Sequence, residues 1–247
     1  MRLQNQVALV TGSATGIGRA TALALAQEGA DIVVNYSRSE EEARETASAV
    51  ESLGRRALLV RADVSQDDQV RAMVERTVAA LGRLDVLVNN AGFTRFVDFQ
   101  DLDALTEEVW DRTYAVNVKG TFFCSRAAAR AMRQQGKGCI VNVASTAGIR
   151  PTGSSIAYCA SKAGVISLTG TLARALGPEI RVNAVAPGFT VTRWNAGRDE
   201  TRRRVEEAAS LRRAGRPEDI AEVIVGLAAG ADYVTGQVVV VDGGWLL

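Results

Sequence analysis

The chain opens on a short apolar run that leads directly into a glycine-rich turn: Val7-Ala8-Leu9-Val10-Thr11-Gly12-Ser13-Ala14-Thr15-Gly16-Ile17-Gly18. Val7 to Val10 is typical of a buried strand, and the pattern from Ile17 to Gln27 predicts a helix. Glycines let the backbone turn sharply, and a helix N-terminus offers free N–H groups to a pyrophosphate. The spacing is G-x-x-x-G-x-G rather than the commoner G-x-G-x-x-G, so a turn without a ligand stays open as the alternative.

The same alternation of apolar strands and amphipathic helices continues along the chain. The further expected strands are Ile32 to Val34, Ala57 to Val60, Val86 to Val88, Cys139 to Val143, Ile180 to Val185 and Val238 to Val241. The further expected helices are Glu40 to Leu53, Val70 to Leu81, Leu105 to Gln135 and Ala157 to Leu176. Short apolar strands between helices are what a parallel sheet covered on both faces requires. The sequence therefore predicts an α/β fold: one Rossmann-like domain over residues 1-247, with a doubly wound parallel sheet of about seven strands.

Composition and charge narrow the classes of partner. A net charge of +1 predicts no nucleic-acid partner, because little charge is available to neutralise phosphates. No apolar run approaches the ~20 residues of a membrane span, and Met1 to Gln6 has no secretory signal. We therefore expect a cytoplasmic protein that does not bind membranes.

The chain has no histidine, and its three cysteines, Cys124, Cys139 and Cys159, lack metal-ligand spacing. We expect no metal site, and we interpret the cysteines as small buried hydrophobic residues. The absence of histidine also excludes Ser-His and Cys-His nucleophiles. Any proton chemistry must come from tyrosine, lysine or carboxylates.

Tyr158 and Lys162 are four residues apart on an expected helix, so both side chains can reach the same cleft. A neighbouring cation lowers the pKa of a tyrosine and makes it useful in acid–base chemistry. Ser145 follows the strand that ends at Val143, where its hydroxyl can hold a carbonyl or alcohol oxygen beside the phenol. Taken alone, such a Tyr–Lys pair is more often an ordinary feature of a helix surface.

Together these motifs resemble the compact, single-domain members of the short-chain dehydrogenase/reductase family, over nearly the whole chain. The resemblance rests on the glycine-rich turn, Asp63-Val64, Asn89-Asn90-Ala91-Gly92, Asn117, Ser145, Tyr158, Lys162, Pro187-Gly188, Gly236-Gln237 and Asp242-Gly243-Gly244. It implies an oxidoreductase that interconverts a ketone and a secondary alcohol with a nicotinamide cofactor.

The resemblance also implies a role for each catalytic residue. Tyr158 would exchange a proton with the substrate oxygen, which Ser145 would hold by a hydrogen bond. Lys162 would lower the pKa of Tyr158 and bind the nicotinamide ribose. Asn117 would anchor a water that relays protons to Lys162.

The implied cofactor-binding residues come from the ends of several strands. They are Gly12, Ser13, Thr15, Gly16, Ile17, Gly18, Ser37, Arg38, Asp63, Val64, Asn90, Ala91, Gly92, Tyr158, Lys162, Pro187, Gly188, Thr190 and Thr192. The glycine-rich turn would line the phosphates, Asp63 and Val64 would meet the adenine, and Thr190 and Thr192 would help to place the carboxamide.

The residues after the second strand indicate which cofactor is preferred. NAD-binding chains place an acid there to hold the ribose 2′-OH, whereas this chain has Tyr36 followed by Ser37 and Arg38. Because nothing repels a 2′-phosphate, we predict NADP(H), with NAD(H) as the second choice. The alternative is that Arg38 is a solvated residue; Thr15 also stands where some NADP-binding relatives carry a basic residue.

Family members carry a mobile substrate lid that corresponds to residues 190-216 here. The segment contains eight arginines and only four acidic residues. This excess of positive charge suits an anionic substrate such as an acyl carrier, a coenzyme A ester or a sugar acid. Alternatively, arginine and glutamate at helical spacing form a solvated face. Trp194 is expected to cover the nicotinamide site or to pack on an apolar substrate.

By overall pattern the chain resembles 3-oxoacyl-[acyl-carrier-protein] reductases most, with glucose or polyol dehydrogenases as the alternative. It departs from the fatty-acid reductases at their docking arginines, where Gly136-Lys137 and Pro178-Glu179 stand. A non-catalytic dinucleotide sensor is the alternative from another class, although such a sensor has no need of all four catalytic residues. Family members commonly form homotetramers, and the apolar tail Trp245-Leu246-Leu247 and the run Ala127-Ala128-Ala129 suit an interface.

Overall fold

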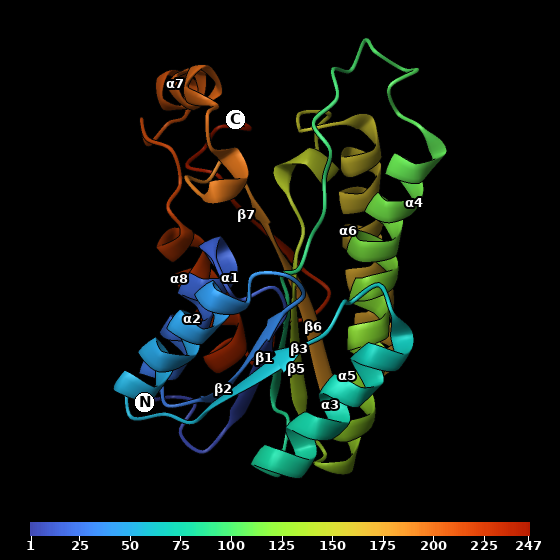
Figure 1. The fold of residues 1–247 in the computed structure, drawn as a ribbon. Coiled ribbons are helices and arrows are strands. Elements are labelled where there is room, and N and C mark those ends of the chain that lie inside the picture. Colours follow the sequence, from blue (N-terminus) through green and yellow to red (C-terminus); the bar gives the residue numbers. More distant parts are fainter.

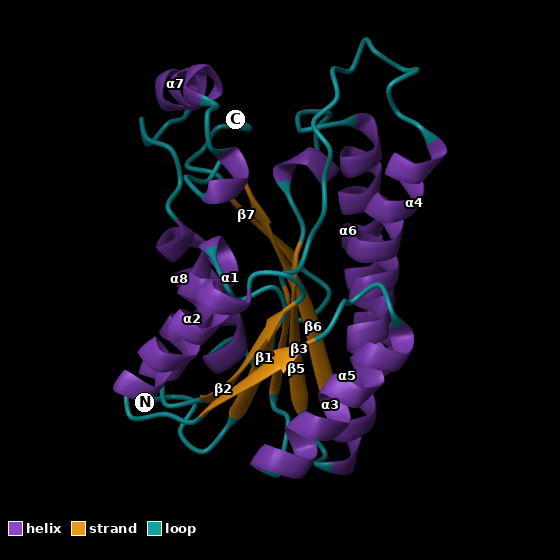
Figure 2. Cartoon of the chain, viewed as in Figure 1, coloured by secondary structure: helices purple, strands orange, loops and turns teal.

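A seven-stranded parallel sheet runs through the middle of the molecule (Figure 2). In the computed structural model, which describes residues 1–247, the strand order is β3-β2-β1-β4-β5-β6-β7. The strands are β1 (Val7–Val10), β2 (Asp31–Tyr36), β3 (Ala57–Arg61), β4 (Val86–Asn89), β5 (Gly138–Val143), β6 (Ile180–Pro187) and β7 (Val238–Val241). The predicted α/β fold with a parallel sheet is confirmed.

Helices cover both faces of the sheet (Figure 1). On one face lie α1 (Gly16–Gln27), α2 (Glu40–Ser52) and α8 (Pro217–Ala229). On the other lie α3 (Asp67–Leu81), α4 (Glu107–Tyr114), α5 (Thr121–Gln134) and α6 (Ile156–Leu176). The short helix α7 (Asp199–Ala208) stands beyond the carboxyl ends of the strands, near the C-terminus.

Strand β1 shows why the strands are apolar throughout. Ala8 and Val10 belong to one core cluster and Val7 and Leu9 to the cluster on the opposite face, and all four residues are buried. Successive side chains of a strand point to opposite faces, so a strand covered on both sides has no position for an exposed polar residue.

The single helix predicted from Leu105 to Gln135 is wrong in its middle. The segment Ala115–Gly120 is π-helical and separates α4 from α5. A Cβ at Gly120 would lie only 2.8 Å from Val64 Cγ2, so the wide turn packs closely against the neighbouring loop. Asn117 lies in this turn with 1% of its surface exposed. Single π turns inside helices are frequent at functional sites.

The 190–216 segment contains a 3₁₀ turn at Arg193–Asn195 and then α7, two elements that the sequence reading did not delimit. On α7, Arg202 pairs with Glu206 at 2.8 Å, and Arg204 pairs with Glu200. These exposed pairs make this face of α7 a solvated one, which was the alternative to an anion-binding surface. No helix of the structure combines the length and apolarity needed to cross a bilayer.

Of the two features expected at a subunit interface, the alanine run packs within the chain, and the interface role of the tail stays a prediction. The alanine run Ala127 to Ala129 is buried in the core cluster between α5 and the sheet, which is the alternative that the sequence left open. Trp245 lines the main cleft, whereas Leu247 is 98% exposed.

Candidate active site

A cleft of about 630 Å³ lies at the carboxyl ends of the strands. The chain first adds strands on one side of β1, as β2 and β3, and then on the other side from β4 onwards, and the switch point between β1 and β4 leaves a crevice in which ligands bind in open α/β sheets. The predicted residues that line the cleft are Gly12, Thr15, Gly16, Ile17, Ser37, Arg38, Asp63, Val64, Asn90, Ala91, Gly92, Ser145, Tyr158, Lys162, Pro187, Gly188, Thr190 and Thr192. The structure thus gathers segments from almost the whole chain around one cavity.

The glycine-rich turn is held in a shape that only glycine permits. Gly12 has a φ of +62°, and a Cβ there would lie 3.0 Å from Ala91 Cα. At Gly18 a Cβ would lie 2.4 Å from the carbonyl oxygen of Gly12, so the helix can start against the turn only because this position has no side chain. Gly18 and Ser13 are buried and do not line the cleft; Ser13 Oγ donates to Val10 O at 2.8 Å.

Asn35 supports this turn, and the sequence reading did not assign it a role. Its Oδ1 accepts from Gly12 N at 3.0 Å, and its Nδ2 donates to Val60 O at 3.3 Å and Ala62 O at 3.1 Å. The side chain is buried and ties the turn to β2 and β3. The available signal was an asparagine that interrupts an otherwise apolar buried strand.

The structure brings Ser145, Tyr158 and Lys162 together, as the sequence predicts. Ser145 lies just past the end of β5, and its Oγ accepts from Ala147 N at 3.1 Å. Ser155 caps α6 by accepting from Tyr158 N at 3.2 Å, which fixes the first turn of the helix that carries the tyrosine. Ser145 and Tyr158 line the same cleft, and the Ser145 hydroxyl lies where it favours the ionised phenol.

The expected lowering of the tyrosine pKa is wrong for this arrangement. Burial raises the pKa of Tyr158 to about 12, and the Ser145 hydroxyl opposes this rise without cancelling it. Lys162 Nζ donates to Val143 O at 2.7 Å and lies 5.7 Å from the centroid of the tyrosine ring. Burial also lowers the pKa of Lys162 to about 8. Desolvation therefore dominates at both groups, and Tyr158 holds its proton at neutral pH.

Asn117 lies behind the wall of the cleft rather than in it. Its Oδ1 accepts from Phe93 N at 2.8 Å, while its Nδ2 donates to Phe93 O and Ser161 Oγ, each at 2.9 Å. The π turn thus holds the segment after β4 against α6. The role of Asn117 as a water anchor stays a prediction.

Trp194 reaches over the catalytic pair. Its ring centroid lies 6.0 Å from that of Tyr158, with 50° between the ring planes. The 190–216 segment therefore contributes an aromatic wall to the cleft. Phe93, Phe96 and Trp245 also line the cleft, and nothing in their local sequence pattern marked them.

Asp63 is held in place by another residue that the sequence reading missed. Arg112 on α4 contacts its carboxylate at 2.9 Å and also donates to Ser65 Oγ at 2.9 Å. The second carboxylate oxygen of Asp63 accepts from Ser65 N at 2.9 Å. Together these contacts fix the loop after β3 along the wall of the cleft.

The end of β2 suits a phosphorylated ribose. Tyr36 is 7% exposed, and no carboxylate follows it in the strand. Ser37 and Arg38 line the cleft beside it, and Arg38 forms no ion pair with any residue of the chain. An unpaired guanidinium beside a cradle of glycine backbone fits a dinucleotide that carries a 2′-phosphate.

The fold and the site define an oxidoreductase of the short-chain dehydrogenase/reductase family, and the chain belongs to that family. A family model described as Enoyl-(Acyl carrier protein) reductase matches residues 12–246.

Particular relatives are similar over almost their full length. The chain is 48% identical to the candidate ketoacyl reductase 2 of the granaticin polyketide synthase from Streptomyces violaceoruber, over 96% of this chain and 95% of the relative. It is 43% identical to 3-oxoacyl-[acyl-carrier-protein] reductase FabG from Thermotoga maritima, over 100% of both chains. A short-chain dehydrogenase from Burkholderia cenocepacia J2315, solved in complex with NADP, is 37% identical over 100% of both chains, with a TM-score of 0.92.

Proposed function

We propose that the protein reduces a 3-oxoacyl thioester to the 3-hydroxyacyl thioester and uses NADPH. The observation that carries this proposal is the hydroxyl pair of Ser145 and Tyr158, set in a cleft beneath Trp194. The similarity to ketoacyl reductases supports the choice of substrate class.

In this mechanism the ketone oxygen lies between the two hydroxyl groups. Ser145 donates a hydrogen bond to that oxygen, and Tyr158 transfers its proton as the carbonyl carbon is reduced. The nicotinamide, when bound, supplies the hydride. Lys162 places a cation near the phenolate that remains after proton transfer and stabilises it.

A raised tyrosine pKa suits the reductive direction. With a pKa of about 12, Tyr158 is protonated at neutral pH and can act as the acid. Closure of Trp194 over the bound substrate would exclude water from the reacting carbon and strengthen both hydrogen bonds to the substrate oxygen. In the reverse direction the same residue would accept a proton from the alcohol.

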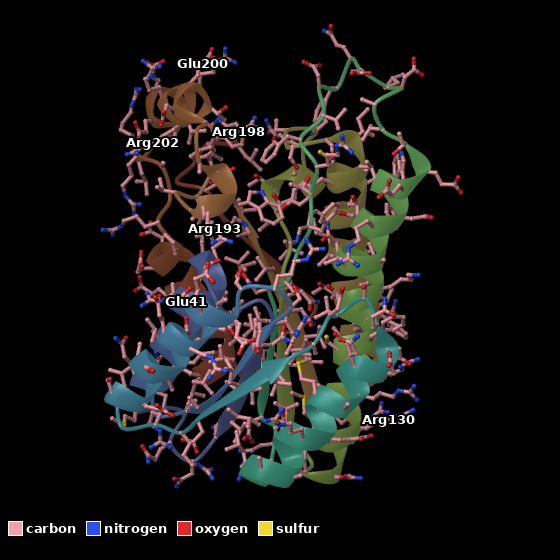
Figure 3. The ribbon with its side chains drawn as sticks, in the orientation of Figure 1. Glu41, Arg130, Arg193, Arg198, Glu200 and Arg202 are labelled. Atoms are coloured by element: carbon pink, nitrogen blue, oxygen red, sulfur yellow. The ribbon has the colours of Figure 1, made fainter.

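The preference for NADPH rests on Ser37 and Arg38, which can both donate to a 2′-phosphate. The variant Arg38→Gln should raise KM for NADPH much more than KM for NADH, since only NADPH carries the phosphate. The control is Arg130→Gln, at an exposed arginine of α5 that lies outside the cleft (Figure 3). An equal change in both KM values would contradict the role of Arg38.

The test of the substrate class is the oxidation of NADPH by purified protein with acetoacetyl thioesters, ethyl acetoacetate and a diketone. In the reverse direction, the reduction of NADP⁺ is measured with sugars and polyols as the alcohol substrates. We expect the acetoacetyl thioesters to have the highest kcat/KM. If turnover were confined to sugars or polyols, the role of Tyr158 would stand, but the proposed substrate class would change from a thioester to a polyol.

Two further parts of the proposal concern mobility and assembly. Residues 190–216 would act as the lid, because the segment carries Trp194 and is fixed to α2 by one exposed ion pair, between Arg193 and Glu42 at 2.6 Å. A homotetramer would form through α5 and α6, where the structure leaves open space at Gly170. Light scattering that shows a monomer would refute the assembly.

A further inference from the structure

One of the eight arginines in the proposed lid, Arg198, both lines the cleft and has no acidic partner. Five of the eight lid arginines form ion pairs, namely Arg193, Arg202, Arg204, Arg213 and Arg216. Arg212 donates instead to a main-chain carbonyl, that of Glu207. Of the remaining two, Arg203 is exposed on α7, whereas Arg198 is half-buried and lines the cleft without an acidic partner.

Arg198 lies at the junction of two cavities. A second groove of about 500 Å³ shares Phe96, Gly153, Ser154 and Arg198 with the main cleft. The guanidinium carbon of Arg198 stacks over the Phe96 ring, 4.2 Å from its centroid. In Figure 3, Arg198 lies on the side of the lid that faces the loop before α4, and Arg202 lies on the opposite side.

The opposite wall of this junction is firmly built. Val97 N donates to Ser154 O at 2.9 Å, and the hydroxyl groups of Thr94 and Ser154 are 2.5 Å apart. The one acid that lines the second groove is Asp98, whose carboxylate accepts from Gln100 N at 2.9 Å and forms no ion pair with Arg198. The groove therefore joins the catalytic cleft to solvent past an uncompensated cation.

We propose that Arg198 is a specificity-determining residue that binds the phosphate at the far end of the pantetheine arm of the thioester substrate. This inference rests on the proposed function. Coenzyme A and acyl carriers share such an arm, with the acyl group on its sulfur and a phosphate at its other end. With the acyl group at Tyr158, the arm runs along the main cleft towards the second groove, and its phosphate lies at the junction of the two cavities, beside Arg198. A guanidinium stacked on an aromatic ring is already oriented for a bidentate contact with phosphate.

The test compares Arg198→Gln with the wild type on substrates with and without the phosphate. The substrates are acetoacetyl-CoA, an acetoacetyl carrier and the acetoacetyl thioester of N-acetylcysteamine, which lacks the phosphate. The measured quantity is the ratio of kcat/KM for a phosphate-bearing thioester to kcat/KM for the N-acetylcysteamine thioester. We expect Arg198→Gln to lower this ratio about 10- to 100-fold, the range for a lost hydrogen bond to a charged group. The matched control, Arg203→Gln on α7, the helix that begins directly after Arg198, should keep the wild-type ratio.

A ratio that Arg198→Gln leaves unchanged would overturn the inference, since the residue would then only support the lid. A ratio that falls for the carrier alone or for coenzyme A alone would show which source the site recognises.

The inference can be tested even if the wild type reduces no thioester, an outcome that would refute the proposed function instead. Calorimetry with phosphopantetheine and with pantetheine, at saturating NADP⁺, measures the contribution of the phosphate directly. We expect wild type to bind phosphopantetheine at least ten times more tightly than pantetheine, a preference that Arg198→Gln loses. Equal affinities in the wild type would overturn the role of Arg198.

Discussion

Replacing Lys162 by methionine should stabilise the fold at neutral pH, and the gain should shrink as the pH rises. Lys162 is 5% exposed, its ammonium contacts Val143 O, and burial lowers its pKa from 10.5 to about 8. Because the folded pKa is below the unfolded one, the unfolded chain binds the proton more tightly. The cost to stability is therefore fully present below about pH 8 and disappears above about pH 10.5.

The difference between the two pKa values sets the size of the effect. It corresponds to a cost of about 3 kcal/mol at pH 7 and less than about 1 kcal/mol at pH 10. Methionine has a similar length, but it leaves Val143 O without this donor, which is a loss that does not depend on pH. The raised pKa of Tyr158 lowers stability only above its unfolded value of 10.0, so the comparison ends at pH 10.

The assay is urea denaturation at pH 7, 8, 9 and 10, at one fixed protein concentration, for the wild type and Lys162→Met. The free energy of unfolding of the variant minus that of the wild type should fall by about 2–3 kcal/mol between pH 7 and pH 10. Lys137→Met, at an exposed lysine, is the control and should show no such slope. A flat difference for Lys162→Met would show that burial does not disfavour the ammonium, and it would refute the reasoning.

Three other substitutions test the site. Tyr158→Phe keeps the ring beside Trp194 and should still bind NADPH, as followed by fluorescence, while kcat falls about 10²- to 10⁴-fold because the proton donor is lost; unchanged turnover would exclude Tyr158 as the acid. Gly18→Ala places a Cβ 2.4 Å from Gly12 O and should weaken dinucleotide binding in a titration. The control Gly226→Ala lies in α8 with open space around it, and it should leave the free energy of unfolding unchanged or raise it by up to about 1 kcal/mol. Asn35→Ala should lower the free energy of unfolding by about 2–4 kcal/mol in urea, because it leaves Gly12 N and two carbonyls without partners; a loss as small as that of Gln134→Ala, at an exposed residue, would contradict this support role.

The local sequence was sufficient to predict the strands, most of the helices and the Tyr158–Lys162 pair. Strands buried on both faces have to be apolar throughout, and this pattern identifies them without knowledge of their neighbours. The spacing of four residues places two side chains on one face of a helix wherever that helix lies. The continuous helix across residues 115–120 was predicted wrongly, because a π turn depends on what packs against it.

Contacts between distant segments were decided only by the tertiary structure. Asn35 could be placed beneath Gly12, and Arg198 over Phe96, only when separate strands and loops met at one end of the sheet. The protonation of Tyr158 was decided in the same way. The sequence places a lysine one helical turn away, but the folded chain gives that ammonium to Val143 O and buries the phenol, so desolvation sets its pKa. The spacing along the chain thus determined which groups could meet, and the packing around them determined in which direction their pKa values move.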